Sequence, residues 1–247
     1  MTENTNSKFP SEADVVIVGV GGIVGSMIAY WLSELGQKNI VGLEKSSVIP
    51  SDIASTAHAS DFVYNTTHDK LGCWTTAYSR KFYEDNGFFL KKGGLEICRK
   101  GDDTRWEELK RKVGSGKAFG TNVRLISASE AKEKFPLLDE ESLMGAMWDP
   151  DAGLVIPRSQ DVVSFAVESA KDKGALKTFT DTPAIDFEVE NGRVTGVKTD
   201  KGFIKTDKVV ICSGIWGPLM GKKAGVPVPL MPLEHPLLFF GPLPEAQ

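Results

Sequence analysis

The stretch that decides the fold is residues 15–25, Val-Val-Ile-Val-Gly-Val-Gly-Gly-Ile-Val-Gly. A helical pattern follows, and residues 39–44, Asn-Ile-Val-Gly-Leu-Glu, complete the order strand, glycine turn, helix and second strand. This order is typical of a βαβ unit that binds a dinucleotide, because glycines let the backbone approach a pyrophosphate and the helix N-terminus stabilises its charge. Glu44, at the end of the second strand, is placed to accept a hydrogen bond from a ribose hydroxyl. The alternative is a glycine-rich turn in an ordinary α/β protein.

The spacing of the glycines is irregular. A G-x-G-x-x-G motif that began with Gly19 and Gly21 would place its third glycine at position 24, which is Val24. Two interpretations remain open. Either Gly22 is a one-residue insertion, or Val20, Gly22 and Gly25 fill the three glycine positions of the motif, with valine in place of the first glycine. The helix itself is regular, since Ala29 and Leu32 fall on its sheet-facing side and Gly36 at its C-terminal end.

The composition is that of a globular protein, with 247 residues, 41% hydrophobic and 25% charged. A net charge of −4 argues against nucleic acid as a partner, and no apolar run is long enough to span a membrane. The cysteines, Cys73, Cys98 and Cys212, show no C-x-x-C spacing, which suits a reducing compartment without disulfides or a metal site. The polar start of the chain predicts a disordered tail over 1–11 and no targeting signal, so we expect a cytoplasmic protein.

Further along the chain, helical and strand patterns alternate. The pattern predicts helices over 66–90, 103–114, 127–135 and 158–173, and strands over 93–98, 174–179, 186–197 (a hairpin that turns at Asn191-Gly192) and 205–212. Ser127 and Glu130 have the spacing of a helix capping box, and the basic run 109–117 is interpreted as a solvated helix face. The predicted fold class is therefore α/β, with a Rossmann-like nucleotide-binding domain and an inserted, incomplete α+β region.

The domain boundaries follow from the separation of the opening βαβ unit from the later strands. We expect a discontinuous nucleotide-binding domain over 12–62 and 156–225, and a substrate or interaction region over 63–155 and 226–247.

Eight short segments resemble a known family and occur in its order over almost the whole chain. They are residues 22–26, 43–44, 55–59, 93–96, 135–139, 192–197, 212–217 and 229–235. The sequence resembles the FAD-dependent amine oxidoreductases of the D-amino-acid-oxidase class, and within it the dimethylglycine and sarcosine dehydrogenases and oxidases. The resemblance implies that the dinucleotide is FAD and that the reaction removes a hydride from an N-methyl group of a methylated glycine, without a catalytic metal.

The resemblance also assigns residues to the cofactor. Those expected to bind FAD are Gly19, Gly21, Gly22, Ile23, Val24, Gly25, Glu44, Lys45, Ser55, Thr56, Ala57, His58, Phe62, Ala184 and Gly214. In the dimethylglycine and sarcosine branch, a histidine in the Ser-Thr-x-His context of His58 is bonded covalently to the flavin. Without the resemblance, His58 is interpreted as a helix-capping or surface histidine.

His235 matches the histidine that the dimethylglycine enzymes place beside the substrate. There it would accept a proton from the substrate ammonium, which frees the amine lone pair to assist departure of the hydride. The alternative for a histidine between Leu233 and Leu237 is a satisfied core residue.

The chain is short for this family. It lacks the expected further substrate sheet, and its apolar end at 236–240 would expose an aggregation-prone edge, so we expect a homo-oligomer or a partner chain. A non-catalytic or truncated flavin-binding subunit is therefore the second hypothesis. An NAD-dependent dehydrogenase is the third, and it leaves the segment 55–58 unexplained.

Overall fold

The computed structural model describes residues 9–234 and 236, and it divides into two compact units. Unit 1 contains the described residues of 1–59 and 159–236, and unit 2 contains residues 60–158. Each unit has sheets and a core of its own.

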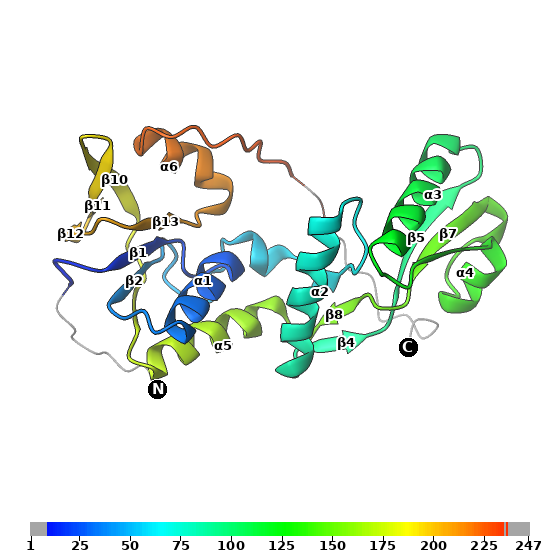
Figure 1. The fold of residues 1–247 in the computed structure, drawn as a ribbon, viewed down its shortest axis with the longest axis horizontal. Helices are drawn as coiled ribbons and strands as arrows, with labels where there is room; N and C mark the ends of the chain where they lie inside the picture. Colours follow the sequence, from blue (N-terminus) through cyan, green and yellow to red (C-terminus); the bar gives the residue numbers. More distant parts are fainter. Residues whose placement is uncertain (1–8, 235, 237–247) are drawn as a thin grey trace. The chain divides into compact units, whose positions relative to one another are not determined.

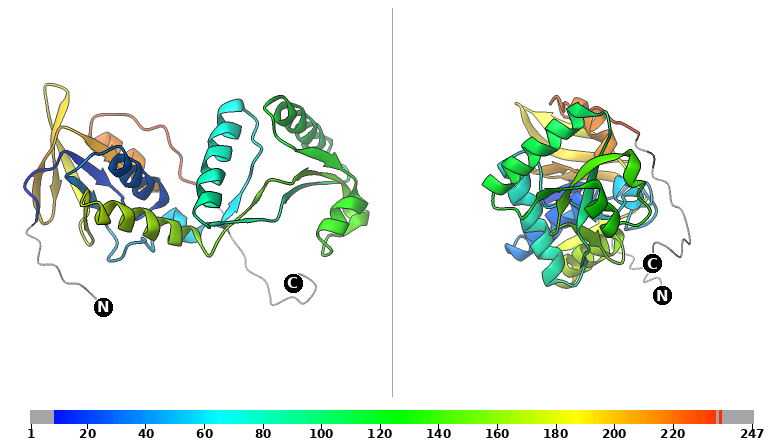
Figure 2. Two further views of the ribbon diagram at one scale, coloured as in Figure 1. Left: turned by 60° about the horizontal axis from the view of Figure 1, so that its bottom comes forward. Right: turned by 90° about the vertical axis from the view of Figure 1, so that its right-hand side faces the viewer.

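Unit 1 is built on a parallel sheet in the order β13-β1-β2-β9. Its strands are β1 (Val15–Val18), β2 (Ile40–Leu43), β9 (Leu176–Phe179) and β13 (Val209–Ile211). Strands β1 and β2 are buried at every position, as parallel strands covered on both faces must be. Helices α1 (Ile23–Glu34) and α5 (Ser159–Asp172) lie side by side on one face, where Ala29, Val163 and Val167 pack against the sheet (Figures 1 and 2).

The other face of this sheet is covered by a small antiparallel sheet and a short helix. The antiparallel strands are β10 (Ala184–Glu190), β11 (Arg193–Thr199) and β12 (Gly202–Lys205), and the helix is α6 (Gly217–Lys223). Phe187, Ile204 and Met220 join the core on this side. The hairpin turns at Asn191 and Gly192, whose φ angles of 50° and 75° are those that a tight two-residue turn requires.

The single strand predicted over 205–212 is wrong. Strand β12 ends at Lys205 in the antiparallel sheet, and β13 begins at Val209 in the parallel sheet. The hydroxyl of Thr206 accepts a hydrogen bond from the Lys208 amide at 3.2 Å and forms a turn between them. Both β12 and β13 have the sequence pattern of a strand, and such a local pattern does not indicate which sheet a strand joins. The sequence therefore did not show that the chain passes from one sheet to another here.

Unit 2 contains two three-stranded antiparallel sheets. One has the order β3-β8-β4, formed by β3 (Phe62–Val63), β8 (Gly153–Val155) and β4 (Phe89–Lys91). The other has the order β5-β7-β6, formed by β5 (Gly94–Arg99), β7 (Leu143–Asp149) and β6 (Arg124–Ile126). Helices α2 (Lys70–Asp85), α3 (Asp103–Ala118) and α4 (Ala128–Lys134) complete the unit.

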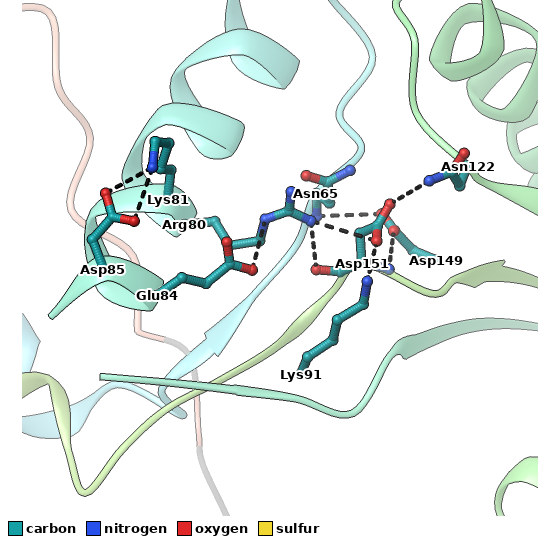
Figure 3. A network of polar contacts seen from close by, with 9 residues as sticks. All are labelled: Asn65, Arg80, Lys81, Glu84, Asp85, Lys91, Asn122, Asp149 and Asp151. Atoms are coloured by element: carbon teal, nitrogen blue, oxygen red, sulfur yellow. Dashed lines mark hydrogen bonds and ion pairs between the residues drawn. The ribbon is translucent and has the colours of Figure 1, made fainter. Parts of the chain in front are cut away.

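A polar network centred on Asp151 connects several elements of unit 2 (Figure 3). Lys91 of β4 donates to the Asp151 carboxylate, and Asn122, which precedes β6, donates to it at 2.8 Å. Arg80 of α2 donates to the Asp151 carbonyl oxygen at 3.1 Å. Burial alone would raise the pKa of the Asp151 carboxyl, but the hydrogen bonds from Lys91 and Asn122 and the charges of Lys91 and Arg80 outweigh it and lower that pKa below its ordinary value.

Two expectations for the helices of unit 2 had different outcomes. Ser127 caps α4 by accepting a hydrogen bond from the Glu130 amide at 3.1 Å, as predicted, although the Glu130 carboxylate pairs with Arg124. The basic run 109–117 is not wholly a solvated face. Lys112 is only 8% exposed and pairs with Glu96, because α3 packs this side against the sheet.

Some expectations fall on residues outside the described part. Of the tail predicted over 1–11, residues 1–8 lie outside it, whereas Phe9 stacks edge-on against Phe179. The apolar end, 237–240, also lies outside the described residues. In the part of the chain that the structure describes, no helix is both long and apolar enough to cross a membrane.

Candidate functional site: a nucleotide cavity in unit 1

A cavity of about 650 Å³ lies in unit 1 at the carboxyl ends of β1, β2 and β13. The N-terminus of α1, the segment 51–56 and the segments 182–185 and 211–217 form its walls. Strand β1 leads through α1 to β2 on one side and has β13 on its other side, so the cavity lies where the strand order reverses. Open α/β sheets bind ligands at this place, because loops diverge there and leave a crevice.

The glycine turn brings the backbone of two strands together. Gly19 has a φ of +91°, and a Cβ atom there would lie 2.5 Å from the carbonyl oxygen of Cys212. A Cβ atom on Gly25 would lie 2.2 Å from the carbonyl oxygen of Gly19, so only glycine lets α1 pack this closely on the turn. Gly22 is the N-cap residue of α1, and Val20 is fully buried. The turn therefore contains one residue more than the motif, but that residue is not Gly22: Gly19 makes the sharp turn after β1, Gly22 begins α1 and Gly25 allows the close packing, so Val20 does not replace the first glycine.

The N-terminus of α1 offers unpaired amide groups to the cavity. The amide of Ile23 donates to the Thr56 hydroxyl at 3.0 Å. Among the residues that the structure describes, the amides of Gly22 and Val24 meet no protein acceptor, and Gly22 makes no side-chain cap. Both residues line the cavity, where the helix dipole favours an anionic group.

Glu44 carries its carboxylate into the site from the end of β2. It is 5% exposed, and its Oε2 atom accepts a hydrogen bond from the Gly21 amide at 2.9 Å. Its Oε1 atom accepts from the Ser46 amide at 2.9 Å and from the Ser51 hydroxyl at 3.1 Å. A carboxylate has about four acceptor positions, so Oε2 keeps capacity for one further donor.

The wall formed by 211–217 adds polar and aromatic groups. The Ser213 hydroxyl is buried and has no hydrogen-bond partner in the described part of the chain, although Ser213 lines the cavity. The ammonium of Lys45 lies 4.8 Å from the centre of the Trp216 ring, a cation–π distance. Burial raises the pKa of Cys212 to about 11, so its thiol stays neutral at pH 7.

The structure brings most of the predicted cofactor residues together. Those that line the cavity are Gly19, Gly22, Ile23, Val24, Glu44, Lys45, Ser55, Thr56, Ala184 and Gly214. Gly21 and Gly25 lie behind the lining, where they contact Glu44 and Gly19.

The remaining predicted residues are not part of this lining. Ala57 and His58 lie in the short 3₁₀ helix Ser55–His58, and the exposed His58 ring has its Nε2 atom 3.1 Å from the Asp52 carbonyl oxygen. Phe62 begins β3 in unit 2. His235 lies outside the described residues, so its proposed role stays a prediction.

Sequence reasoning missed several residues of the site. Ser213 and Trp216 belong to a segment that had been singled out, but only Gly214 of it was assigned to the cofactor. No sequence signal pointed to Ser51, because its role depends on how the loop after β2 folds back onto the glycine turn.

The donor set fits an adenine dinucleotide. The unpaired amides of Gly22 and Val24 suit a pyrophosphate, the free capacity of Glu44 suits a ribose hydroxyl, and the unpartnered Ser213 hydroxyl suits a polar group of a ligand. In the described ranges, no three His, Cys, Asp or Glu side chains come together as a metal site would require.

Comparison with known proteins identifies relatives over most of the chain. A family model described as FAD dependent oxidoreductase (DAO) matches residues 14–247. The mitochondrial sarcosine dehydrogenase of Homo sapiens is 29% identical over 95% of this chain, and the mitochondrial dimethylglycine dehydrogenase of Homo sapiens is 26% identical over 94% of it. The mitochondrial pyruvate dehydrogenase phosphatase regulatory subunit of Mus musculus is 31% identical over 92%. The chain spans only 26%, 27% and 26% of these three proteins, respectively.

Solved structures share the fold. The L-proline dehydrogenase of P. horikoshii superposes with a TM-score of 0.78 at 30% identity, covering 88% of this chain and 57% of that one. The glycine oxidase of Bacillus cereus has a TM-score of 0.69 at 27% identity, covering 85% of this chain and 58% of that one.

Proposed function

Because the chain belongs to the FAD dependent oxidoreductase (DAO) family, we propose that it is the flavin-binding portion of an enzyme that oxidises an N-methyl group of a methylated glycine. The cavity at the switch point of the parallel sheet, with unpaired helix amides beside a buried carboxylate, is the observation that supports the FAD site. The similarity to sarcosine and dimethylglycine dehydrogenases supports the substrate class.

In this proposal the residues of unit 1 hold the adenosine half of FAD. The amides of Gly22 and Val24 bind the pyrophosphate, and Glu44 accepts a hydrogen bond from the ribose. Ala184 offers backbone groups beside the adenine. The Ile23 amide already donates to the Thr56 hydroxyl, so the pyrophosphate is bound by the neighbouring amides.

When bound, FAD supplies the hydride acceptor for oxidation of the amine. The chain's own residues bind and orient the ligand. His235 is proposed to accept the proton of the substrate ammonium, because only a neutral amine has the lone pair that assists loss of a hydride from its methyl group.

We propose His58 as the site of covalent attachment to the flavin, on the basis of its Ser-Thr-x-His context. Its Nε2 atom lies 3.1 Å from a carbonyl oxygen, a distance that suits an N–H donor at Nε2, and in the neutral imidazole this leaves the lone pair on Nδ1. Acid precipitation tests the assignment. Covalent FAD stays in a yellow pellet, and His58→Ala should release the colour to the supernatant while noncovalent binding persists. A pellet that stays yellow in the variant excludes His58.

The absorption spectrum of the purified protein tests the function as a whole. A flavin spectrum that is bleached by dimethylglycine or sarcosine under anaerobic conditions supports amine oxidation. A colourless protein that binds no added FAD refutes the cofactor assignment.

A second function is favoured by one observation, the 31% identity with a regulatory subunit. In that case the chain binds flavin without turnover and acts with a partner chain. The same spectrum separates the two functions, because the flavin would then be present but would not be bleached by either amine. Size-exclusion chromatography tests the partner separately, since a stable monomer would count against an obligatory oligomer.

A further inference from the structure

Ser51 is a buried neighbour of the Glu44 carboxylate in unit 1 and lines the same cavity. The serine is 2% exposed, and its hydroxyl donates a hydrogen bond to Glu44 Oε1 at 3.1 Å. Glu44 Oε1 also accepts a hydrogen bond from the Ser46 amide at 2.9 Å, whereas Oε2 accepts one from the Gly21 amide alone among the described residues. The protein thus supplies two donors to Oε1 and one to Oε2, which leaves Oε2 as the oxygen with capacity for a ligand.

The backbone holds Ser51 in this position. Its amide donates to the Gly21 carbonyl oxygen at 2.9 Å, so the loop after β2 is bonded to the glycine turn. A Cβ atom on Gly21 would lie 2.8 Å from the Cβ atom of Ser51, which shows how closely the two backbones approach. These backbone contacts therefore hold the Ser51 side chain in place. Its hydrogen bond to Oε1 restricts rotation of the Glu44 carboxylate.

We propose that Ser51 is a positioning residue that sets the preference of this cavity for a ribose with free hydroxyls. It acts through Glu44: by engaging Oε1, it directs Oε2 toward the ligand. This inference rests on the proposed dinucleotide site. A buried carboxylate oriented in this way favours a ligand with a ribose hydroxyl, because a ligand without one leaves the carboxylate oxygen unpaired.

The chain offers a matched control in Ser46. It is also buried in the same loop, but its hydroxyl donates to Asp52 at 2.5 Å, and only its backbone amide contacts Glu44. Ser46→Ala therefore removes a buried loop hydroxyl but keeps the backbone amide that donates to Glu44. Ser51→Ala keeps the Cβ atom that packs on Gly21, so it removes the hydroxyl alone.

The test compares ADP with 2′,3′-dideoxy-ADP by calorimetric titration of the full chain, prepared free of flavin by expression in riboflavin-starved cells. We expect the wild type to prefer ADP by about tenfold, the size of one hydrogen bond to a charged group. Ser51→Ala should reduce the preference to about twofold, mainly through weaker ADP binding, and Ser46→Ala should keep the wild-type ratio. Ser51→Cys, with a weak donor of similar size, should be intermediate.

Each ratio compares the affinities for ADP and 2′,3′-dideoxy-ADP in one protein preparation. Partial unfolding of a variant reduces binding of both nucleotides by the same factor, so it leaves this ratio unchanged. The inference is overturned if Ser51→Ala weakens both nucleotides by the same factor, or if Ser46→Ala lowers the ratio as much. If the wild type binds both nucleotides equally, Glu44 makes no ribose contact and the inference fails while FAD binding stands. If the wild type binds neither nucleotide nor FAD, the proposed function fails with it.

Discussion

The glycine turn of unit 1 and the Asp151 network of unit 2 hold their surroundings together by different means. In unit 1, glycines at positions 19 and 25 let backbones approach to distances that no Cβ atom would permit, and the bonds across the turn use backbone amides. In unit 2, the side chains of Lys91, Asn122 and Arg80 converge on Asp151 (Figure 3). The first arrangement depends on the absence of side chains and the second on their charge, so they should respond to different substitutions.

The largest effect is expected from Gly25→Ala. The added Cβ atom would lie 2.2 Å from the Gly19 carbonyl oxygen, so α1 must move away from the turn. We expect a loss of about 3 kcal/mol in the free energy of unfolding, measured with urea, together with loss of ADP binding.

Gly114→Ala in α3 is the matched control, because its Cβ atom would meet nothing within 4 Å. A helix-interior glycine replaced by alanine without strain should stabilise by about 0.5–1 kcal/mol. Equal behaviour of the two variants would show that close packing at the turn is unimportant.

Asp151→Asn should have the next largest effect, on unit 2. The variant keeps the size of the side chain but removes the charge that Lys91 and Arg80 face in a partly buried site. We expect a loss of about 2 kcal/mol in the free energy of unfolding. Asp85→Asn, which affects an exposed ion pair with Lys81, should leave the free energy of unfolding unchanged within error. A loss as large as that of Asp151→Asn would show that the Asp151 network stabilises no more than an exposed ion pair.

The same network predicts a pH dependence. Although burial raises it, the pKa of Asp151 is lowered overall in the folded protein, so its stabilising contribution is present above the unfolded-state value and is lost as the pH falls through the folded-state value. The difference in unfolding free energy between wild type and Asp151→Asn should therefore be constant near pH 7 and shrink below about pH 4. A difference that stays constant down to pH 3 would contradict a charge-based network.

The smallest effect is expected for Thr56→Val, which keeps the shape of the side chain but removes the acceptor of the Ile23 amide. Loss of this contact at the start of α1 should lower the free energy of unfolding, measured by thermal unfolding, by about 1 kcal/mol. Thr75→Val removes a hydroxyl that, among the described residues, bonds to carbonyl groups of its own helix, so it should change stability by less than about 0.5 kcal/mol. If the two variants lose the same amount, the contact between the loop and α1 adds nothing of its own.

The difference between the two regions also explains what could be predicted. The βαβ unit was predictable because its strands, helix and glycines are consecutive, and the same spacing placed Gly22, Ile23, Val24 and Glu44 around one cavity. The Asp151 network was not predicted, because its partners come from separate strands and helices, with Lys91 sixty positions away along the chain. The strand assigned to 205–212 was wrong for a related reason, since a local pattern shows that a segment is extended but not which sheet it joins.

The sequence by itself determined the family, the opening βαβ unit and the residues of that unit that line the cavity, because these depend on short-range order in the chain. The tertiary structure decided which glycines take the three roles in the turn, that Ser51 donates a hydrogen bond to Glu44, and that Asp151 joins the elements of unit 2. The physical reason is that hydrogen bonds and close contacts act over a few ångströms, and only folding sets those distances between residues remote in sequence.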